Sequence, residues 1–258
     1  MLATQALTDA LQVIYREALR SPWICLNALK DPTSAPNRPT AGRDAPPVLV
    51  LGGFLSHPYY YAPFGRLLGQ QGFLVHYDEV FNAAPFKPHV RALGERAARI
   101  AEDAGKPIRI VGHSLGGLQA IALLVQRPDA IEQVITVASP IVGGTPWRPL
   151  QRLAERVLDV HASETEVLRE DLGPYARRVT TISSPQDLVA PPPACTIDGA
   201  TNVVLSTLPR RDESLASHIG VIFMETVVQI VLASLARADV QNLSDAAGDA
   251  GSPTGGLE

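Results

Sequence analysis

Short apolar segments alternate with helix-length segments through most of this chain, and that alternation is the strongest constraint on its fold. Residues 48–51 form an apolar run that ends at two glycines, Gly52 and Gly53. Runs without polar alternation are typical of strands buried on both faces of a parallel sheet. Further strand candidates follow at residues 73–77, 108–111, 134–138, 179–183 and 203–206. The alternation predicts an α/β fold, with a mostly parallel sheet covered by helices on both faces.

Helical patterns occupy several of the segments between these strands. Residues 88–105 carry apolar side chains at helical spacing along one side, and residues 115–126 are apolar nearly all round. A closing helix is expected from residue 218 onward. We expect a single domain over residues 1–258, with an amphipathic helix and an irregular connector in residues 1–45 and a flexible tail over residues 240–258.

Residues 145–175 interrupt the alternation, because two helices are predicted there with no strand between them. Within this segment Leu150, Leu153, Val157 and Leu158 form an apolar stripe among charged residues. We expect the segment to form a small helical cap, or lid, over the carboxyl edge of the sheet, where ligands bind in open α/β folds. The alternative is a crossover connection that packs on the flank of the sheet and never meets substrate.

Composition excludes several classes of function. The formal net charge is −4 and no basic run is present, whereas nucleic-acid binding needs clustered Lys and Arg. No stretch approaches the roughly 20 apolar residues that span a bilayer. No metal-ligand cluster or phosphate-binding loop is evident, so no cofactor or metal is expected. The sequence leaves the oligomeric state open.

The location of the protein is only weakly indicated. Residues 1–20 lack the basic start and compact apolar core of a signal peptide, so a cytoplasmic location is expected. A secreted protein whose leader has been removed is the alternative. The two cysteines, Cys25 and Cys195, could pair or stay reduced, and the sequence does not separate these states.

The segment Gly112-His113-Ser114-Leu115-Gly116 matches the pattern G-x-S-x-G. It follows the strand predicted at 108–111 and precedes the helix predicted at 115–126, which is the setting of a nucleophile elbow. In such a turn the serine has a strained backbone and projects from the sheet, and the glycines leave room for it. A glycine-rich turn with an incidental serine is the alternative. The strand and helix on either side favour Ser114 as a nucleophile.

Together with Gly117, these residues give the string Gly-His-Ser-Leu-Gly-Gly, which resembles the bacterial lipases and related esterases of the α/β-hydrolase superfamily. The resemblance covers roughly residues 46–235. It implies a serine hydrolase that cleaves carboxylic esters of small molecules or lipids through an acyl-serine intermediate. A thioesterase or acyltransferase with the same machinery, and a non-catalytic binding module on a hydrolase scaffold, remain alternatives.

The other two members of a catalytic triad follow from chain order, which in this fold is Ser, then Asp or Glu, then His. Of the six histidines, only His161 and His218 come after Ser114, and His218 alone follows the last predicted strand. The segment that contains Asp187 follows the strand at 179–183 and resembles the part of these enzymes that carries the triad acid. Asp198 is its main rival. We expect the triad to be Ser114, Asp187 and His218.

Backbone amides are expected to form the oxyanion hole of the site. One is the amide of Leu115, the residue after the nucleophile. Lipases of this kind usually carry His-Gly-x after the first strong strand, with x as the second donor. This chain has Gly52 in place of the histidine, and by position the donor is Phe54. The alternative is that the two glycines only form a sharp exit from the strand.

Four side chains are candidates for contact with substrate. Tyr59 and Tyr60 lie just downstream of the expected oxyanion residues and could line an acyl or alcohol pocket, although aromatic residues in a row also serve simple packing. Leu153 and Val157 belong to the predicted cap. They could supply apolar surface for an acyl chain.

Overall fold

The computed structural model describes residues 46–78, 82–142, 144–146, 148–160, 168–205 and 217–237. In these ranges, six strands form one sheet, and every pairing between them is parallel. Their order across the sheet is β2-β1-β3-β4-β5-β6. The strands are β1 (Pro47–Leu51), β2 (Leu74–Tyr77), β3 (Ile108–His113), β4 (Ile131–Val137), β5 (Val179–Ser183) and β6 (Thr201–Val204). The predicted α/β fold is confirmed.

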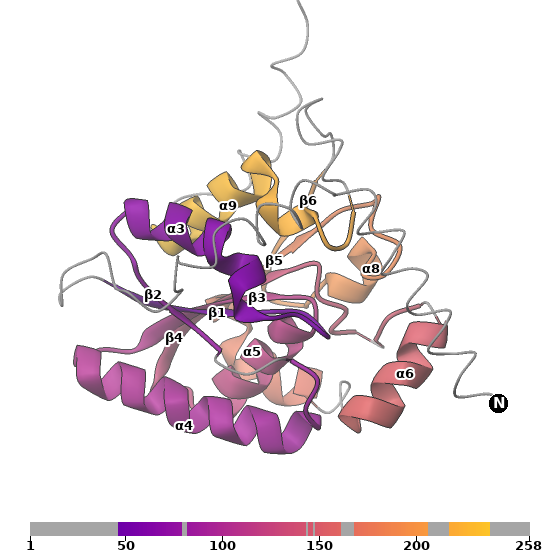
Figure 1. Cartoon of the computed structure of the whole chain (residues 1–258), viewed down its shortest axis with the longest axis horizontal. Coiled ribbons are helices and arrows are strands. Elements are labelled where there is room, and N and C mark those ends of the chain that lie inside the picture. The colour runs from indigo at the N-terminus through magenta and orange to yellow at the C-terminus, as the bar shows by residue number, and fades with distance from the viewer. Residues whose placement is uncertain are drawn as a thin grey trace, which may run out of the picture.

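Helices cover both faces of the sheet (Figure 1). On one face lie α3 (Ala62–Gln70) and α9 (Glu225–Leu235), and on the other lie α4 (Phe86–Ala104) and α5 (Leu115–Gln126). Strand β1 shows why both layers are needed, because all five of its residues are buried. Val48 and Val50 join the core under α3 and α9, whereas Leu49 and Leu51 join the core under α4 and α5. A strand with an apolar side chain at every position is stable only between two such layers.

Several elements differ from the sequence-based expectation. The closing helix α9 begins at Glu225, because residues 217–220 form a turn and Val221–Phe223 a short 3₁₀ helix (η4). Helix α3 was not predicted, and neither was the 3₁₀ helix η1 (Pro58–Tyr61) before it. Gly65 lowers the helix propensity of α3, yet glycine is needed there, since a Cβ would lie 1.6 Å from the Tyr77 hydroxyl. The short helix α8 (Pro192–Cys195) was also missed.

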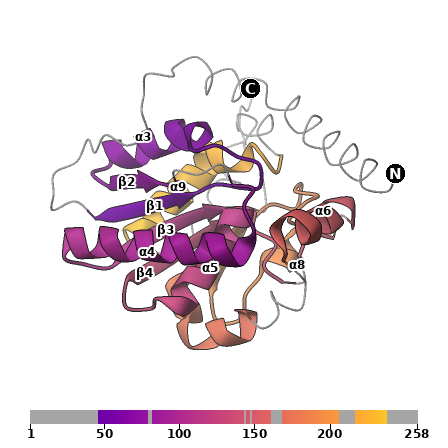
Figure 2. The ribbon, with the colours of Figure 1, turned by 60° about the horizontal axis from the view of Figure 1, so that its bottom comes forward.

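The carboxyl ends of the strands define the edge at which the functional groups gather. Helix α6 (Arg148–Leu158) lies beyond this edge, close to the start of α5 (Figure 2). The cap segment continues with a helical stretch at 168–172 and the 3₁₀ helix η2 (Gly173–Arg178). The expected N-terminal helix, the tail over 240–258, His161 and Cys25 fall outside the described residues. No helix in the described ranges is long and apolar enough to cross a membrane.

Candidate active site

Ser114 occupies the sharp turn between β3 and α5. Its backbone has φ 55° and ψ −121°, a conformation that costs a non-glycine residue about 1–3 kcal/mol. The surrounding structure holds the turn, since the Ser114 amide donates to the carbonyl oxygen of Val137 at 3.0 Å. The serine is therefore presented at the carboxyl edge of the central strands with its side chain turned away from the sheet core.

Close backbone packing explains the glycines on either side of Ser114. A Cβ at Gly112 would lie 2.4 Å from the carbonyl oxygen of Gly116, and a Cβ at Gly116 would lie 2.4 Å from that of Leu51. Backbone atoms cannot yield as flexible side chains do, so both positions require glycine. Gly117 instead packs against the side chains of Thr136 and Ser139, with a Cβ there 2.0 Å from Ser139 Oγ.

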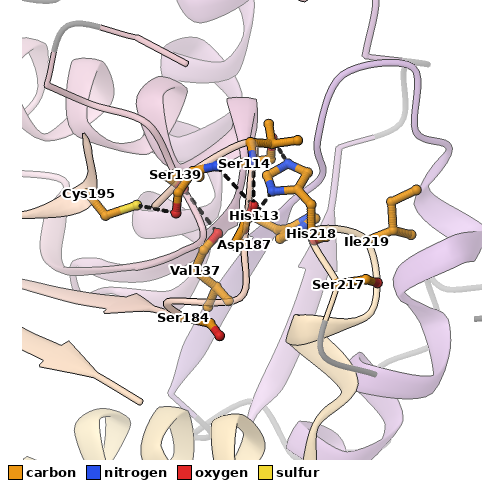
Figure 3. A network of polar contacts seen from close by, with 12 residues as sticks. His113, Ser114, Val137, Ser139, Ser184, Asp187, Cys195, Ser217, His218 and Ile219 are labelled. Carbon is orange, nitrogen blue, oxygen red and sulfur yellow. Dashed lines mark hydrogen bonds and ion pairs between the residues drawn. The ribbon is translucent and has the colours of Figure 1, made fainter. Parts of the chain in front are cut away.

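His218 lies between Ser114 and Asp187 and contacts both (Figure 3). Its Nε2 lies 2.8 Å from Ser114 Oγ, and its Nδ1 lies 2.8 Å from Asp187 Oδ2. A carboxylate only accepts, so Nδ1 carries the proton and Nε2 presents its lone pair to the serine hydroxyl. The structure thus brings together the three residues predicted for the triad. The rival Asp198 is exposed, in a turn before β6.

Asp187 is buried, yet its surroundings favour the charged form. Burial by itself would raise its pKa, but His218 and the amides of Ala190 and Val189 outweigh that effect and hold the pKa of Asp187 below its usual value. The two amides donate to Oδ1 at 2.9 and 2.8 Å, which leaves Oδ2 for the histidine. This carboxylate is held as a fixed hydrogen-bond acceptor for His218.

The loop at 52–54, which we call the oxyanion loop, lies directly against the serine. A Cβ on Gly53 would be 3.2 Å from Ser114 Cβ. The carbonyl oxygen of Gly53 accepts from the amide of Ser56 at 3.1 Å and from its hydroxyl at 2.6 Å. In a trans peptide the N–H points opposite to the C=O, and no cis peptide occurs in the described chain. The N–H of Phe54 therefore points to the side opposite Ser56.

The second expected amide belongs to Leu115, the first residue of α5. N–H groups in the first turn of a helix have no partner within the helix and point outward along its axis. This amide directly follows Ser114 in the chain and stands at the positive end of the α5 dipole. Leu115 and Phe54 both line the cavity that contains Ser114. The two residues predicted to supply the oxyanion donors thus both lie at the cavity beside Ser114.

Asn82 holds the far side of the oxyanion loop. Its side-chain amide donates to the carbonyl oxygen of Gly52 at 2.6 Å and to Gln119 Oε1 at 3.1 Å. Its backbone accepts from the Leu55 amide at 2.9 Å and donates to the Ser56 carbonyl oxygen at 3.1 Å. Gln119 returns a bond to Asn82 Oδ1 at 2.9 Å. Sequence reasoning missed both residues, and their only signal was the presence of polar side chains among apolar neighbours.

A small cavity of about 100 Å³ opens beside Ser114, between α5 and α6. Its lining is mostly apolar and includes Phe54, Leu118 and Val189. From α6 it receives Leu150, Gln151, Ala154, Glu155 and Leu158. A hollow of about 720 Å³ lies at the opposite edge of the sheet, where β4, β5 and β6 begin. The larger hollow holds none of the predicted site residues, so the smaller one is the candidate substrate pocket.

The structure corrects the side chains expected to touch substrate. Leu153 is buried elsewhere, Val157 is 36% exposed, and neither lines the cavity. Tyr59 is 42% exposed and stacks on His57, and Tyr60 packs edge-on against Phe223. Tyr59 and Tyr60 therefore also lie outside the cavity lining. Helix α6 does contribute to the pocket, through Leu150 and Leu158 of the predicted stripe together with Gln151, Ala154 and Glu155.

Cys195 lies beneath the segment that carries Asp187. Its thiol is free and donates to the carbonyl oxygen of Ala190 at 3.3 Å. Burial, with the nearby Asp187 charge, raises the pKa of Cys195 to about 12. The thiol is therefore a packing group rather than a nucleophile. Among the described residues, no group of three or more His, Cys, Asp or Glu side chains is arranged to hold a metal ion.

Comparison with known proteins finds one family that matches part of the chain and several solved structures with a similar fold. Residues 84–197 match the family described as serine aminopeptidase, S33. No curated protein matches the sequence.

The solved structures that resemble this chain include lipases and a thioesterase. Aspergillus fumigatus lipase B has a TM-score of 0.66 and 16% identity, over 80% of this chain and 57% of the other. A Bacillus licheniformis lipase in its mature form has a TM-score of 0.59 and 13% identity, over 76% of this chain and 93% of the lipase. The thioesterase domain from the curacin biosynthetic pathway has a TM-score of 0.50 and 15% identity, over 74% of this chain and 92% of the thioesterase domain. At these identities the likeness concerns the fold.

Proposed function

We propose that this chain, a member of the α/β-hydrolase superfamily, hydrolyses carboxylic esters through an acyl intermediate on Ser114. The observation that carries the proposal is the position of His218, which lies 2.8 Å from both Ser114 Oγ and Asp187 Oδ2. A hydroxyl, an imidazole and a carboxylate in that order are the parts that nucleophilic acyl transfer requires.

In the first half of the reaction, Ser114 Oγ attacks the ester carbonyl carbon while His218 Nε2 takes the hydroxyl proton. Asp187 keeps His218 in the tautomer whose Nε2 can accept that proton, and it stabilises the imidazolium that forms. The carbonyl oxygen becomes an oxyanion that accepts from the amides of Phe54 and Leu115. Collapse of this intermediate breaks the C–O bond, and the departing alkoxide takes the proton from His218 Nε2.

In the second half, water replaces the alcohol. His218 Nε2 removes a proton from the water as its oxygen attacks the acyl carbon, and the same two amides stabilise the second oxyanion. The acyl–Oγ bond then breaks, and Ser114 recovers its proton from His218. The products are a carboxylic acid, an alcohol and the unchanged enzyme.

The small cavity beside Ser114 suits the acyl part of such an ester. Its apolar walls favour burial of an alkyl chain, at roughly 25 cal/mol per Å² of apolar surface. Its volume of about 100 Å³ is small beside the roughly 300–1,000 Å³ of typical ligand pockets. We therefore propose esters with a short acyl chain as preferred substrates.

Hydrolysis of an amide is a second candidate, because the matching family is described as a serine aminopeptidase. A carboxylate at the pocket also favours it: Glu155 lines the cavity and accepts from Gln151 Nε2 at 3.1 Å. A negative charge there could pair with an amine of the substrate. A thioester is the third possibility, since the same acyl-serine chemistry applies to it.

A substrate panel with matched variants tests the proposal. Wild-type protein is assayed with p-nitrophenyl butyrate, a butyryl thioester and an aminoacyl p-nitroanilide. We expect the ester to give the highest kcat/KM and Ser114→Ala to abolish its hydrolysis. Ser234→Ala, which removes a buried serine hydroxyl of α9, is the control and should retain activity. Faster cleavage of the anilide or thioester would replace the ester proposal, and full activity of Ser114→Ala would refute the mechanism.

A further inference from the structure

A chain of buried hydrogen bonds runs behind Ser114, and the triad mechanism does not use it. The Gly53 amide lies 2.8 Å from the Tyr61 hydroxyl, and that hydroxyl lies 2.9 Å from His113 Nδ1. His113 Nε2 in turn lies 2.8 Å from the carbonyl oxygen of His218. The chain thus begins in the oxyanion loop and ends in the segment that carries the catalytic base.

The chemistry of the groups fixes the direction of every bond in this chain. A backbone carbonyl only accepts, so His113 Nε2 carries a proton and donates it to His218. His113 Nδ1 is then the bare nitrogen and accepts from the Tyr61 hydroxyl. The Tyr61 oxygen in turn accepts from the Gly53 amide. Each donor has one acceptor and the direction never reverses.

The protonation states agree with these directions. Burial, with the neighbouring His218, lowers the pKa of His113 to about 3, so this imidazole is neutral near pH 7. Burial raises the pKa of Tyr61 to about 12, so its hydroxyl keeps its proton. Neither group is a candidate for proton transfer in the reaction. Their effect is on geometry.

We propose that Tyr61 and His113 are positioning residues that hold the oxyanion loop and the loop of His218 at a fixed spacing around Ser114. This inference rests on the proposed function. His113 is bonded covalently to Ser114, so one network joins the nucleophile, the oxyanion donor and the base. These parts come from β3, from the loop after β1 and from the turn before α9, and only tertiary contacts can set their spacing.

The space around Gly52 supports the same assignment. A Cβ at Gly52 would lie 2.5 Å from Tyr61 Cε2, so the tyrosine ring occupies the volume that a side chain at this position would need. This chain departs from the His-Gly-x pattern of the lipases it resembles at this residue. The departure is explained physically, because Tyr61 fills that place and its hydroxyl anchors the next amide along the loop.

Hydrogen bonds hold both the carbonyl oxygen and the N–H of the Gly52–Gly53 peptide, which directly precedes the peptide of the Phe54 amide. Asn82 holds its carbonyl oxygen and Tyr61 holds its N–H. The next amide along the chain is that of Phe54. Without the Tyr61 hydroxyl, only the bonds from Ser56 to the Gly53 carbonyl oxygen hold the Gly53–Phe54 peptide, so the torsion at Gly53 can change and the Phe54 amide loses part of its aim at the oxyanion. The substrate carbonyl accepts strongly only in the transition state, so the loss falls on kcat rather than KM.

The test compares Tyr61→Phe with wild type. Active sites are counted by end-point titration with a fluorophosphonate, so that misfolded molecules do not enter kcat. We expect kcat per active site for p-nitrophenyl butyrate to fall by about 10- to 100-fold, somewhat less than the 10²–10³ lost with a whole oxyanion donor. KM should change little. The affinity of a boronic acid, which forms a tetrahedral adduct on Ser114, should fall by the same factor as kcat.

Two further variants separate positioning from simple stabilisation. Tyr77→Phe removes another buried tyrosine hydroxyl, one that lies against Gly65 of α3, and it should keep kcat per active site. His113→Leu breaks the same chain, so combining it with Tyr61→Phe should add little to the loss from either alone. Unchanged kcat and boronate affinity in Tyr61→Phe, or fully multiplicative losses in the double variant, would overturn the inference. An inactive wild-type protein would instead refute the proposed function.

Discussion

The buried His113 makes the stability of this protein depend on pH in a range where carboxylates contribute little. His113 is 3% exposed, and burial together with the nearby His218 lowers its pKa to about 3. In the unfolded chain a histidine has a pKa of about 6.5. The unfolded state therefore binds a proton that the folded state rejects. The contribution of the neutral, buried His113 to the free energy of unfolding is fully present above about pH 6.5 and is lost as the pH falls toward 3.

The magnitude of this effect follows from the two pKa values. Between pH 7 and pH 5, the unfolded state gains most of one proton at His113 while the folded state gains almost none. At about 1.4 kcal/mol per proton and pH unit, with partial titration near pH 6.5, the free energy of unfolding falls by about 2 kcal/mol from this residue alone.

Urea unfolding at pH 7 and pH 5 measures the effect, with wild type and His113→Gln as the pair. Glutamine does not titrate, so its pH-independent cost cancels when each protein is compared with itself. Wild type should lose about 2 kcal/mol more than the variant between the two pH values. Other histidines titrate in both proteins and cancel as well. An equal loss in both proteins would show that His113 accepts a proton in the folded state, and the buried hydrogen-bond chain would have to be redrawn.

Three further predictions concern single side chains. Gly52→Ala should destabilise the fold by about 1–3 kcal/mol in urea unfolding, since its Cβ would lie 2.3 Å from Ser56 Oγ. Gly173→Ala is the control and should not destabilise the fold, because a Cβ at Gly173 meets open space. Ala154→Leu should fill part of the pocket and lower kcat/KM for a hexanoate ester relative to an acetate ester by at least about tenfold. Val157→Ala is the control and should leave the hexanoate-to-acetate ratio of kcat/KM unchanged. If Ala154→Leu also leaves this ratio unchanged, the cavity is not the acyl pocket. Asp187→Asn should lower kcat by about 10⁴-fold, as in the serine protease triad. Asp198 is exposed, so Asp198→Asn should change kcat little. A larger loss in Asp198→Asn than in Asp187→Asn would mean that the triad acid is misassigned.

The parts that sequence reasoning could predict are those with strong local signals. Strands β1, β3 and β4 contain short apolar runs, helical segments lie between most of the strands, and a parallel sheet follows from that order. The turn at Ser114 carries glycines at the two positions where backbone atoms come within 2.4 Å of a Cβ, so its sequence reports its geometry directly. Chain order then selected His218, because only one histidine follows the last strand, whereas Asp187 was selected by the resemblance of its segment to the part of these hydrolases that carries the triad acid.

The cap shows where local patterns fail. Of the predicted stripe, Leu150 and Leu158 line the cavity, whereas Leu153 and Val157 do not. The face that lines the cavity carries Leu150, Ala154 and Leu158, at a spacing of four residues. Ala154 contributes little to an apolar pattern, so this face was not distinguished from its neighbour. Which face of a helix meets a pocket depends on its packing against distant elements, and a single helix does not encode that.

Tyr61 and His113 were missed for a related reason. Tyr61 is 52 residues from His113 in sequence, and His113 is 105 residues from the carbonyl oxygen that it binds. Tyr61 belonged to a run of aromatic residues that resembled ordinary packing, and His113 precedes Ser114 in the chain, so chain order excluded it from the triad. Long-range hydrogen bonds of this kind leave no periodic signal in the sequence.

Labelling with a fluorophosphonate, followed by peptide mapping, tests whether Ser114 is a nucleophile activated by His218. We expect one adduct per chain, on the peptide that contains Ser114. The adduct should be absent from Ser114→Ala and form far more slowly in His218→Ala, because the unassisted hydroxyl is a weak nucleophile. An adduct on another residue, or labelling of His218→Ala at the wild-type rate, would contradict the account.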